Sequence, residues 1–157
     1  MDIAGNIRKV REVVAQAAAR SGRSPTEVRL MAVTKTVDDE RIMEAIDCGV
    51  DIIGENYVQE AKRKIEKMGK KVEWHMIGYL QSNKAKYAVR IFDMIHSVDR
   101  TSLARELDRR ARAADRPMKI LIEVNLSGEA TKSGVRREDI PALLRELSAL
   151  DYLSVQG

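Results

Sequence analysis

Short apolar runs alternate with amphipathic helical patterns along this chain, and the alternation limits the folds open to it. Each β-branched, apolar run is followed by a segment whose apolar residues recur every three or four positions. Six such strands alternating with helices predict right-handed βαβ units and an α/β fold with a parallel sheet. The predicted strands cover residues 30–34, 51–54, 72–77, 94–98, 119–125 and 152–155. The predicted helices cover residues 3–20, 38–48, 56–68, 100–114 and 137–150, with a short one after the loop 78–84.

Two architectures fit this order of elements: an open doubly wound sheet and a (β/α)8 TIM-type barrel. Neither G-x-G-x-x-G nor G-x-x-x-x-G-K-[ST] follows the first strand, so the nucleotide-binding open sheets lose support. A complete barrel has eight strands and typically about 250 residues. With 157 residues, the chain would form an incomplete barrel with about six of its strands.

Composition argues against several classes of protein. The single cysteine, Cys48, allows no disulfide within the chain and favours a cytoplasmic location. No apolar run approaches the roughly 18 residues of a membrane span, and the N-terminus has no signal-peptide pattern. Basic residues alternate with acidic ones and aromatic residues make up 4%, so nucleic-acid binding is not expected despite the formal charge of +4. One cysteine and two histidines without HExxH or CxxC spacing predict no metal site.

Lys35 lies at the carboxyl end of the first predicted strand, directly before a helical pattern. Burial at such a position disfavours the charged ammonium group and frees the amine as a nucleophile, which can form a Schiff base with an aldehyde. The alternative is a strand-end lysine whose stem packs on the protein while its head reaches solvent. Lys35 is therefore a candidate reactive residue.

Polar residues follow five successive predicted strands. In both architectures ligands bind at the carboxyl ends of the strands, so these residues are expected to surround one cleft. For Asn56 and Asp99, which precede helices, capping of the helix is an equally good explanation. For His75 and His96, a hydrogen bond to a backbone carbonyl is the default. The polar residues are Lys35, Glu55, Asn56, His75, Ser97, Asp99, Glu123 and Asn125.

Several of these residues stand in motifs that together are specific, and they occur in one order over almost the whole chain. The segments are Ala32-Val33-Thr34-Lys35-Thr36, Gly54-Glu55-Asn56-Tyr57-Val58-Gln59-Glu60, Trp74-His75-Met76-Ile77-Gly78-Tyr79-Leu80-Gln81-Ser82-Asn83-Lys84, His96-Ser97-Val98-Asp99, and Asn125 with Lys132-Ser133-Gly134. With these segments in this order, the chain resembles the pyridoxal 5′-phosphate homeostasis protein family.

The resemblance implies a barrel like the N-terminal domain of alanine racemase, with pyridoxal 5′-phosphate (PLP) bound as a Schiff base on Lys35. It implies a carrier or regulator of cofactor supply without catalytic turnover, and PLP-dependent apoenzymes as partners. Asn56, His75 and Asn125 would lie beside the cofactor, and the loop with Ser133 at the mouth of the site. The implied cofactor-binding residues are Lys35, Asn56, His75, Asn125, Ser133 and Gly134.

The family pattern continues beyond the sixth strand with a Gly-Leu-Met segment and a Ser/Gly-rich phosphate-binding motif, whereas this chain ends at Gly157. We therefore expect a single PLP-binding barrel domain over residues 1–157, truncated after the sixth strand. Barrels bind phosphate with the loops after strands seven and eight, so weak retention of PLP is expected. The full-length form is expected to be a monomer, and the six-stranded form, with open sheet edges, to self-associate.

Two other functions use a Schiff base on the same lysine. A PLP-dependent amino-acid racemase or decarboxylase would need a second acid or base opposite the lysine, and no tyrosine or cysteine is obviously placed for that role. A Schiff-base aldolase barrel would need no PLP. Both remain alternatives to the homeostasis protein.

Overall fold

A six-stranded parallel sheet forms the centre of the molecule. The computed structural model describes residues 2–129 and 131–157. Every neighbouring pair of strands in the sheet is parallel, which confirms the predicted α/β class. In spatial order the strands are β1 (Met31–Val33), β2 (Ile52–Glu55), β3 (Glu73–Met76), β4 (Met94–Val98), β5 (Met118–Ile122) and β8 (Leu153–Val155).

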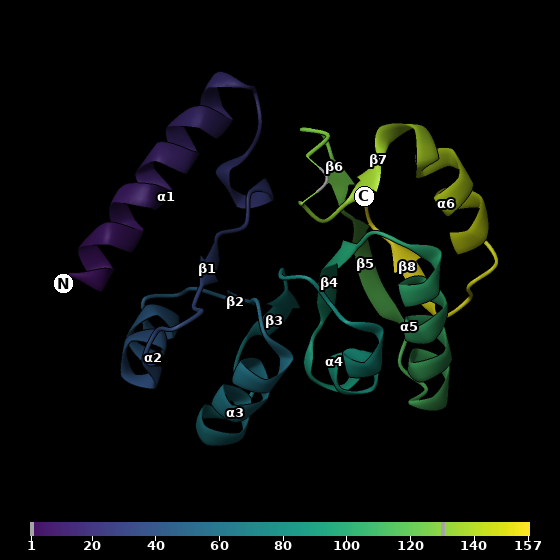
Figure 1. Cartoon of the computed structure of the whole chain (residues 1–157). Coiled ribbons are helices and arrows are strands. Elements are labelled where there is room, and N and C mark those ends of the chain that lie inside the picture. The colour runs from purple at the N-terminus through teal and green to yellow at the C-terminus, as the bar shows by residue number, and fades with distance from the viewer. Residues whose placement is uncertain (1, 130) are drawn as a thin grey trace.

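The order of the strands in space repeats their order along the chain, without the reversal that marks a doubly wound sheet. This is the arrangement of a barrel wall. β1 and β8 lie at opposite ends of the sheet and do not pair, so the barrel is not closed (Figure 1). Both are short edge strands with a neighbour on one side only.

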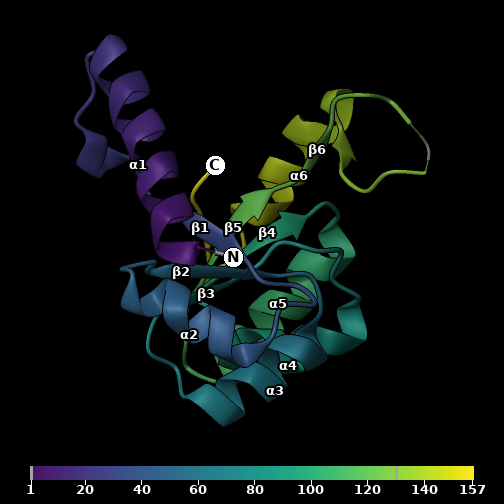
Figure 2. The same ribbon diagram turned by 90° about the vertical axis from the view of Figure 1, so that its left-hand side faces the viewer.

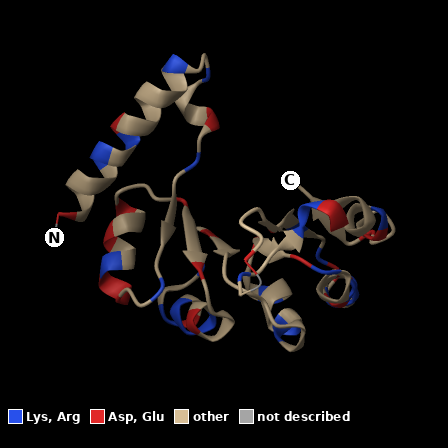
Figure 3. Cartoon of the chain, turned by 45° about the horizontal axis from the view of Figure 1, so that its top comes forward, with Lys and Arg blue, Asp and Glu red and all other residues tan. Residues whose placement is uncertain are grey.

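Helices cover one face of the sheet and stand at its two ends. Figure 2 shows the sheet above α2 (Asp39–Asp47), α3 (Val58–Met68), α4 (Ala85–Ile91) and α5 (Thr101–Ala113). α1 (Ile3–Arg20) stands at the β1 end and α6 (Ile140–Leu147) at the β8 end. Figure 3 shows basic and acidic residues interleaved along the helices. Among the described residues, no helix is long and apolar enough to cross a membrane.

The core lies between the sheet and the covering helices. Ile53, Trp74, Ile95 and Ile120 come from adjacent strands, are almost fully buried and belong to one apolar cluster. Burial of side chains of this size is the main stabilising term of the fold, since each contributes about 1.5–3 kcal/mol. The alternate residues of the same strands, including His75, face the other side of the sheet.

Two predicted elements differ from the structure. The strand predicted at 119–125 ends at Ile122, and β6 (Val124–Asn125) pairs instead with β7 (Val135–Arg136) in a separate small sheet. The β4–β5 register shifts between Ile95 and Val98, which turns the chain away from the main sheet. The helix predicted at 137–150 begins as the 3₁₀ turn Arg137–Asp139 and becomes α-helical where a proline occupies the first turn of α6.

Short 3₁₀ turns at Pro25–Glu27 and Ser82–Lys84 were absent from the predicted elements. The first has a capping box. The Ser24 side chain accepts a hydrogen bond from the backbone of the turn, and the Glu27 carboxylate accepts one from the Ser24 amide. Its pattern of serine, proline and glutamate is a readable signal for such a turn. The second leads directly into α4.

Candidate functional site

Lys35 lies in the turn that follows β1, and its side chain is exposed. Of the two alternatives for this lysine, the structure shows the strand-end lysine that reaches solvent. Its strand, β1, is an edge strand with β2 as its only neighbour in the sheet. Its amine is thus open to a ligand from the solvent side.

The backbone around Lys35 is held tightly. Thr34 is buried; its amide donates to the carbonyl of Gly54 (3.0 Å), and its hydroxyl donates to Glu55 Oε1 (2.6 Å). Thr36 has a φ of 61°, which is unusual for a β-branched residue. The turn that carries Lys35 is therefore fixed in an uncommon conformation between β1 and α2.

Asn56 lies between β2 and α3 and is partly buried. It does not cap α3, whose N-cap is Tyr57 without a side-chain hydrogen bond, so the capping explanation does not hold here. Gly78 packs against it so closely that an added Cβ would lie 2.5 Å from the Asn56 carbonyl oxygen. Asn56, Gly78, Gln81 and Lys84 line an open pocket of about 520 Å³ at the carboxyl ends of β2 and β3.

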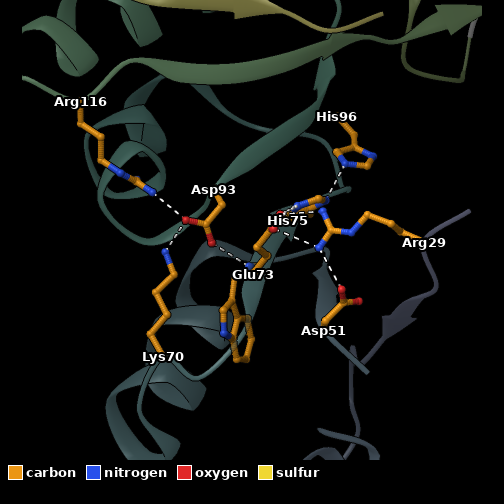
Figure 4. Close-up of polar contacts among 9 residues, drawn as sticks. Arg29, Asp51, Lys70, Glu73, His75, Asp93, His96 and Arg116 are labelled. Atoms are coloured by element: carbon orange, nitrogen blue, oxygen red, sulfur yellow. Dashed lines mark hydrogen bonds and ion pairs between the residues drawn. The ribbon is translucent and has the colours of Figure 1, made fainter. Parts of the chain in front are cut away.

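His75 and His96 form a side-chain pair on the face of the sheet opposite the core helices (Figure 4). His75 Nδ1 lies 3.0 Å from His96 Nε2, and His75 Nε2 lies 3.2 Å from Glu73 Oε2. Arg29 donates to Glu73 (3.0 Å) and to Asp51 (3.2 Å), which extends the line of contacts to the amino end of the sheet. Both histidines thus use side chains, not the backbone carbonyls expected by default.

The electrostatics of this line follow from its contacts. Burial, and then the charge of His75, lower the pKa of His96. The hydrogen bond from Arg29 lowers the pKa of Glu73, with a smaller contribution from His75. The sequence contained a signal for the pair, since the two histidines lie on successive strands. Their contact could be predicted only from the strand register, in which His75 lies opposite Met94 and His96 follows two residues later on the same face.

The remaining predicted site residues lie in the segment that follows β5. The Asn125 side-chain Nδ2 donates to the backbone carbonyl of Glu129 (2.9 Å), and its Oδ1 accepts from the backbone amide of Gly128 (3.0 Å). This side chain therefore holds its own loop together. Gly134 has a φ of 113°, and an added Cβ there would lie 2.6 Å from the Asn125 amide nitrogen. Ser133, beside it, is partly buried.

Two acidic residues lie near this loop. Asp99 accepts a hydrogen bond from Arg100 (2.6 Å) and one from the amide of Gly134 (3.4 Å), and it does not cap α5, whose N-cap is Arg100. Burial, and then the charge of Asp99, raise the pKa of Glu123. Ser97 is buried, and its hydroxyl has no hydrogen-bond partner among the described residues.

The structure brings these residues together in two groups. Lys35 and Asn56 follow β1 and β2, whereas Asn125 ends β6 and Ser133 and Gly134 lie in the loop between β6 and β7. His75 lies on β3, between the two groups. The side chain of His75 contacts Glu73 and His96, so the predicted residues lie at separate places in the fold.

The sequence and the structure both match known proteins. Residues 3–157 match the family model of the alanine racemase N-terminal domain. The pyridoxal phosphate homeostasis protein of Escherichia coli (strain K12) is 41% identical over 160 residues, which cover 99% of this chain and 68% of that protein. The protein of the same name from Pseudomonas aeruginosa is 40% identical, with 99% and 68% covered.

Solved structures give the same picture. PipY of Synechococcus elongatus PCC7942, with PLP bound, superposes with a TM-score of 0.79 at 37% identity, covering 92% of this chain and 68% of that one. Alanine racemase from Corynebacterium glutamicum superposes with a TM-score of 0.70 at 19% identity, covering 99% and 41%. The second likeness concerns the fold alone and identifies the six-stranded sheet as part of a TIM-type barrel wall.

Proposed function

The chain belongs to the family of pyridoxal phosphate homeostasis proteins, and from that membership we propose that it binds PLP and serves in its intracellular homeostasis without catalytic turnover. The observation that carries the proposal is the likeness to PipY, whose structure contains PLP. In this proposal Lys35 holds the cofactor as a Schiff base. Asn56, His75, Asn125, Ser133 and Gly134 are the further residues proposed to contact it.

The residues at the carboxyl ends of the strands fit such a ligand. PLP supplies an aldehyde, which condenses with a lysine amine with loss of water, and the exposed side chain of Lys35 offers that amine. Asn56 and Lys84 line the open pocket at the carboxyl ends of β2, the neighbour of β1, and β3, and they offer an amide and a positive charge. The tight packing of Gly78 on Asn56 fixes the wall of this pocket.

Trapping the bound cofactor tests the assignment of Lys35. The chain is mixed with PLP, reduced with borohydride and digested, and the labelled peptide is identified by mass spectrometry. The adduct is expected on Lys35 and is expected to disappear in Lys35→Ala. Lys119, exposed and opposite Met94 on the same face of the sheet, is the matched control, so Lys119→Ala should keep the label. Labelling mainly at Lys119 or elsewhere would contradict the assignment.

Turnover separates this function from an enzyme of the same fold. The Escherichia coli and Pseudomonas aeruginosa relatives are named homeostasis proteins, and the likeness to the Corynebacterium glutamicum alanine racemase is at 19% identity. We expect the PLP-loaded protein to leave the configuration of L-alanine unchanged over a long incubation. Racemisation or decarboxylation that depends on Lys35 would show an enzyme instead. A shift of the PLP absorbance that is lost in Lys35→Ala separates both from an aldolase barrel.

We further propose that residues 1–157 act as one domain and that PLP-dependent apoenzymes accept the cofactor from it. The open edges at β1 and β8 favour self-association of the chain, whereas the full-length form is proposed to be a monomer. Light scattering at several protein concentrations tests the self-association. Reactivation of a PLP-free apoenzyme by the loaded protein tests direct transfer. If transfer is direct, the apoenzyme should be reactivated in the same compartment but not when a membrane that retains both proteins separates them. The cytoplasmic location that the single cysteine, Cys48, favours stays a prediction.

A further inference from the structure

A fully buried lysine lies directly beneath the turn that carries Lys35. The side chain of Lys64, on α3, has 0% of its surface exposed. Its Nζ donates to Glu55 Oε1 (2.6 Å), to Glu60 Oε1 (2.7 Å) and to the backbone carbonyl of Thr34 (2.6 Å). A buried ammonium group is tolerated only when it is paired and hydrogen-bonded, and here all three of its protons have acceptors.

The Glu60 carboxylate links this buried lysine to the residue after Lys35. The same Oε1 that accepts from Lys64 also accepts from the Thr36 amide (2.8 Å). Burial would raise the pKa of Glu60, but the hydrogen bonds from Lys64 and Thr36 outweigh it, so the pKa lies below its usual value. The carboxylate is therefore the charged acceptor that both donors require.

Thr36 needs such support because of its backbone conformation. Its φ of 61° lies in the left-handed region, which is unfavourable for an L-residue with a Cβ. A strained residue persists only where its surroundings determine it, and such residues gather at functional sites. Here the strained residue directly follows the lysine to which the Schiff base is assigned.

We propose that Lys64 and Glu60 are positioning residues that hold the turn from Thr34 to Thr36 and thereby aim the Lys35 amine for Schiff-base formation. Lys64 fixes the turn at the Thr34 carbonyl, and Glu60 fixes it at the Thr36 amide, so Lys35 is held on both sides. Neither residue touches the cofactor in this scheme. The inference rests on the proposed function of Lys35.

Stability alone gives a weaker account of these contacts. Apolar side chains in place of both Lys64 and Glu55 would fill the same space without the cost of burying charge. Glu55 Oε2 is also buried and has no hydrogen-bond partner among the described residues, so the network keeps an unsatisfied acceptor. Such a network is expected where a geometry at a site is being maintained.

A rescue experiment tests the scheme. The rate of Schiff-base formation with PLP is followed by absorbance at fixed pH for the wild-type chain, Glu60→Ala, Thr36→Gly and the double variant, each checked for folding by circular dichroism. We expect Glu60→Ala to slow the reaction by about tenfold, because the turn loses its left-handed conformation. Adding Thr36→Gly should restore most of the rate, since glycine adopts positive φ without cost.

Lys64→Met should also slow the reaction, whereas Lys62→Met, an exposed neighbour on α3, should react like the wild type. If Lys64→Met does not fold, the Glu60 and Thr36 variants decide, because the Glu60 side chain is 21% exposed and its loss is tolerated more easily. Equal rates for wild type and Glu60→Ala, or a loss that Thr36→Gly does not restore, would overturn the proposal.

The two levels of proposal fail in different ways. A wild-type chain that forms no Schiff base at Lys35 contradicts the proposed function and removes the positioning role with it. A wild-type chain that reacts at Lys35 with a rate independent of Glu60 contradicts only the positioning role. Deuterium exchange of the Thr36 amide gives a readout without PLP, and it should be faster in Glu60→Ala than in the wild type.

Discussion

The rings of His75 and His96 meet across β3 and β4, with their facing nitrogens 3.0 Å apart and their planes tilted by 50°. A hydrogen bond between these two nitrogens needs only one N–H proton. Positive charge on both rings would make them repel each other. Glu73 accepts at the other side of His75 and is itself held by Arg29. The pair is thus the centre of a polar line that crosses the open face of the sheet.

Titration of His96 is expected to make the fold less stable in mild acid. The pKa of His96 is lowered, so below the usual value of about 6.5 the unfolded chain binds a proton that the folded chain resists. Its full contribution to stability is therefore present above about pH 6.5 and is lost as the pH falls through the lowered pKa. Urea unfolding between pH 7 and pH 5.5 should show this slope, and His96→Gln should flatten it.

The charged groups near His96 decide whether the pH dependence of stability can be assigned to this histidine. His75 lies in contact with it, and Glu73 and Arg29 lie beyond. The pKa of Glu73 is lowered, so that carboxylate stays charged over the tested pH range and adds no slope. Identical slopes for wild type and His96→Gln would contradict the prediction.

Asp93 should contribute strongly to stability, because it joins β3 to the loops that precede β3 and β5 (Figure 4). Its Oδ1 accepts from Lys70 (2.7 Å) and Arg116 (2.8 Å), and its Oδ2 accepts from the Trp74 amide (2.9 Å). Asp93→Ala removes these charged hydrogen bonds and should cost about 2–3 kcal/mol. Asp151→Ala, which breaks an exposed pair, should cost less than about 1 kcal/mol in the same urea titration. Equal costs would show that the Asp93 contacts are weak.

Gly78 should resist enlargement. A methyl group there would lie 2.5 Å from the Asn56 carbonyl oxygen and 2.7 Å from its Cα, so one backbone segment must shift. We expect Gly78→Ala to cost about 1–3 kcal/mol and to weaken PLP binding by displacing Asn56. Gly157→Ala is the control, since its methyl would meet only the end of the Leu121 side chain, at 3.4 Å. Unchanged stability and affinity in Gly78→Ala would show that this contact relaxes freely.

Lys64→Met should be among the more damaging single substitutions on α3. It leaves Glu55, whose side chain is fully buried, without its cation, and breaking a buried pair typically costs about 3–5 kcal/mol. Lys62→Met removes only an exposed contact with Glu66 (3.6 Å) and should be nearly neutral. Thermal or urea unfolding of both variants decides, and a small cost for Lys64→Met would mean that water reaches Glu55 in the variant.

Local patterns in the sequence determined the elements and their order. The predicted strand at 94–98 matches β4, because its residues are apolar on the core side and bounded by a turn and a helix. The helix at 38–48 differs from α2 only by its caps, since Asp38 and Cys48 are the N-cap and C-cap. Alternating strands and helices then leave little choice but a parallel sheet. The family motifs placed the candidate site at the carboxyl ends of those strands.

Only the tertiary structure decided which charged side chains are buried. In sequence Lys64 resembles its neighbours Lys62 and Lys67 on a basic helix, yet it alone of the three is buried, because α3 turns it toward Glu55 and the β1 turn. For Lys35 the sequence left burial and exposure as alternatives, and the structure shows it exposed, after a strand at the edge of the sheet. Burial depends on the elements that pack against a residue, and sequence periodicity reports only the face on which it lies.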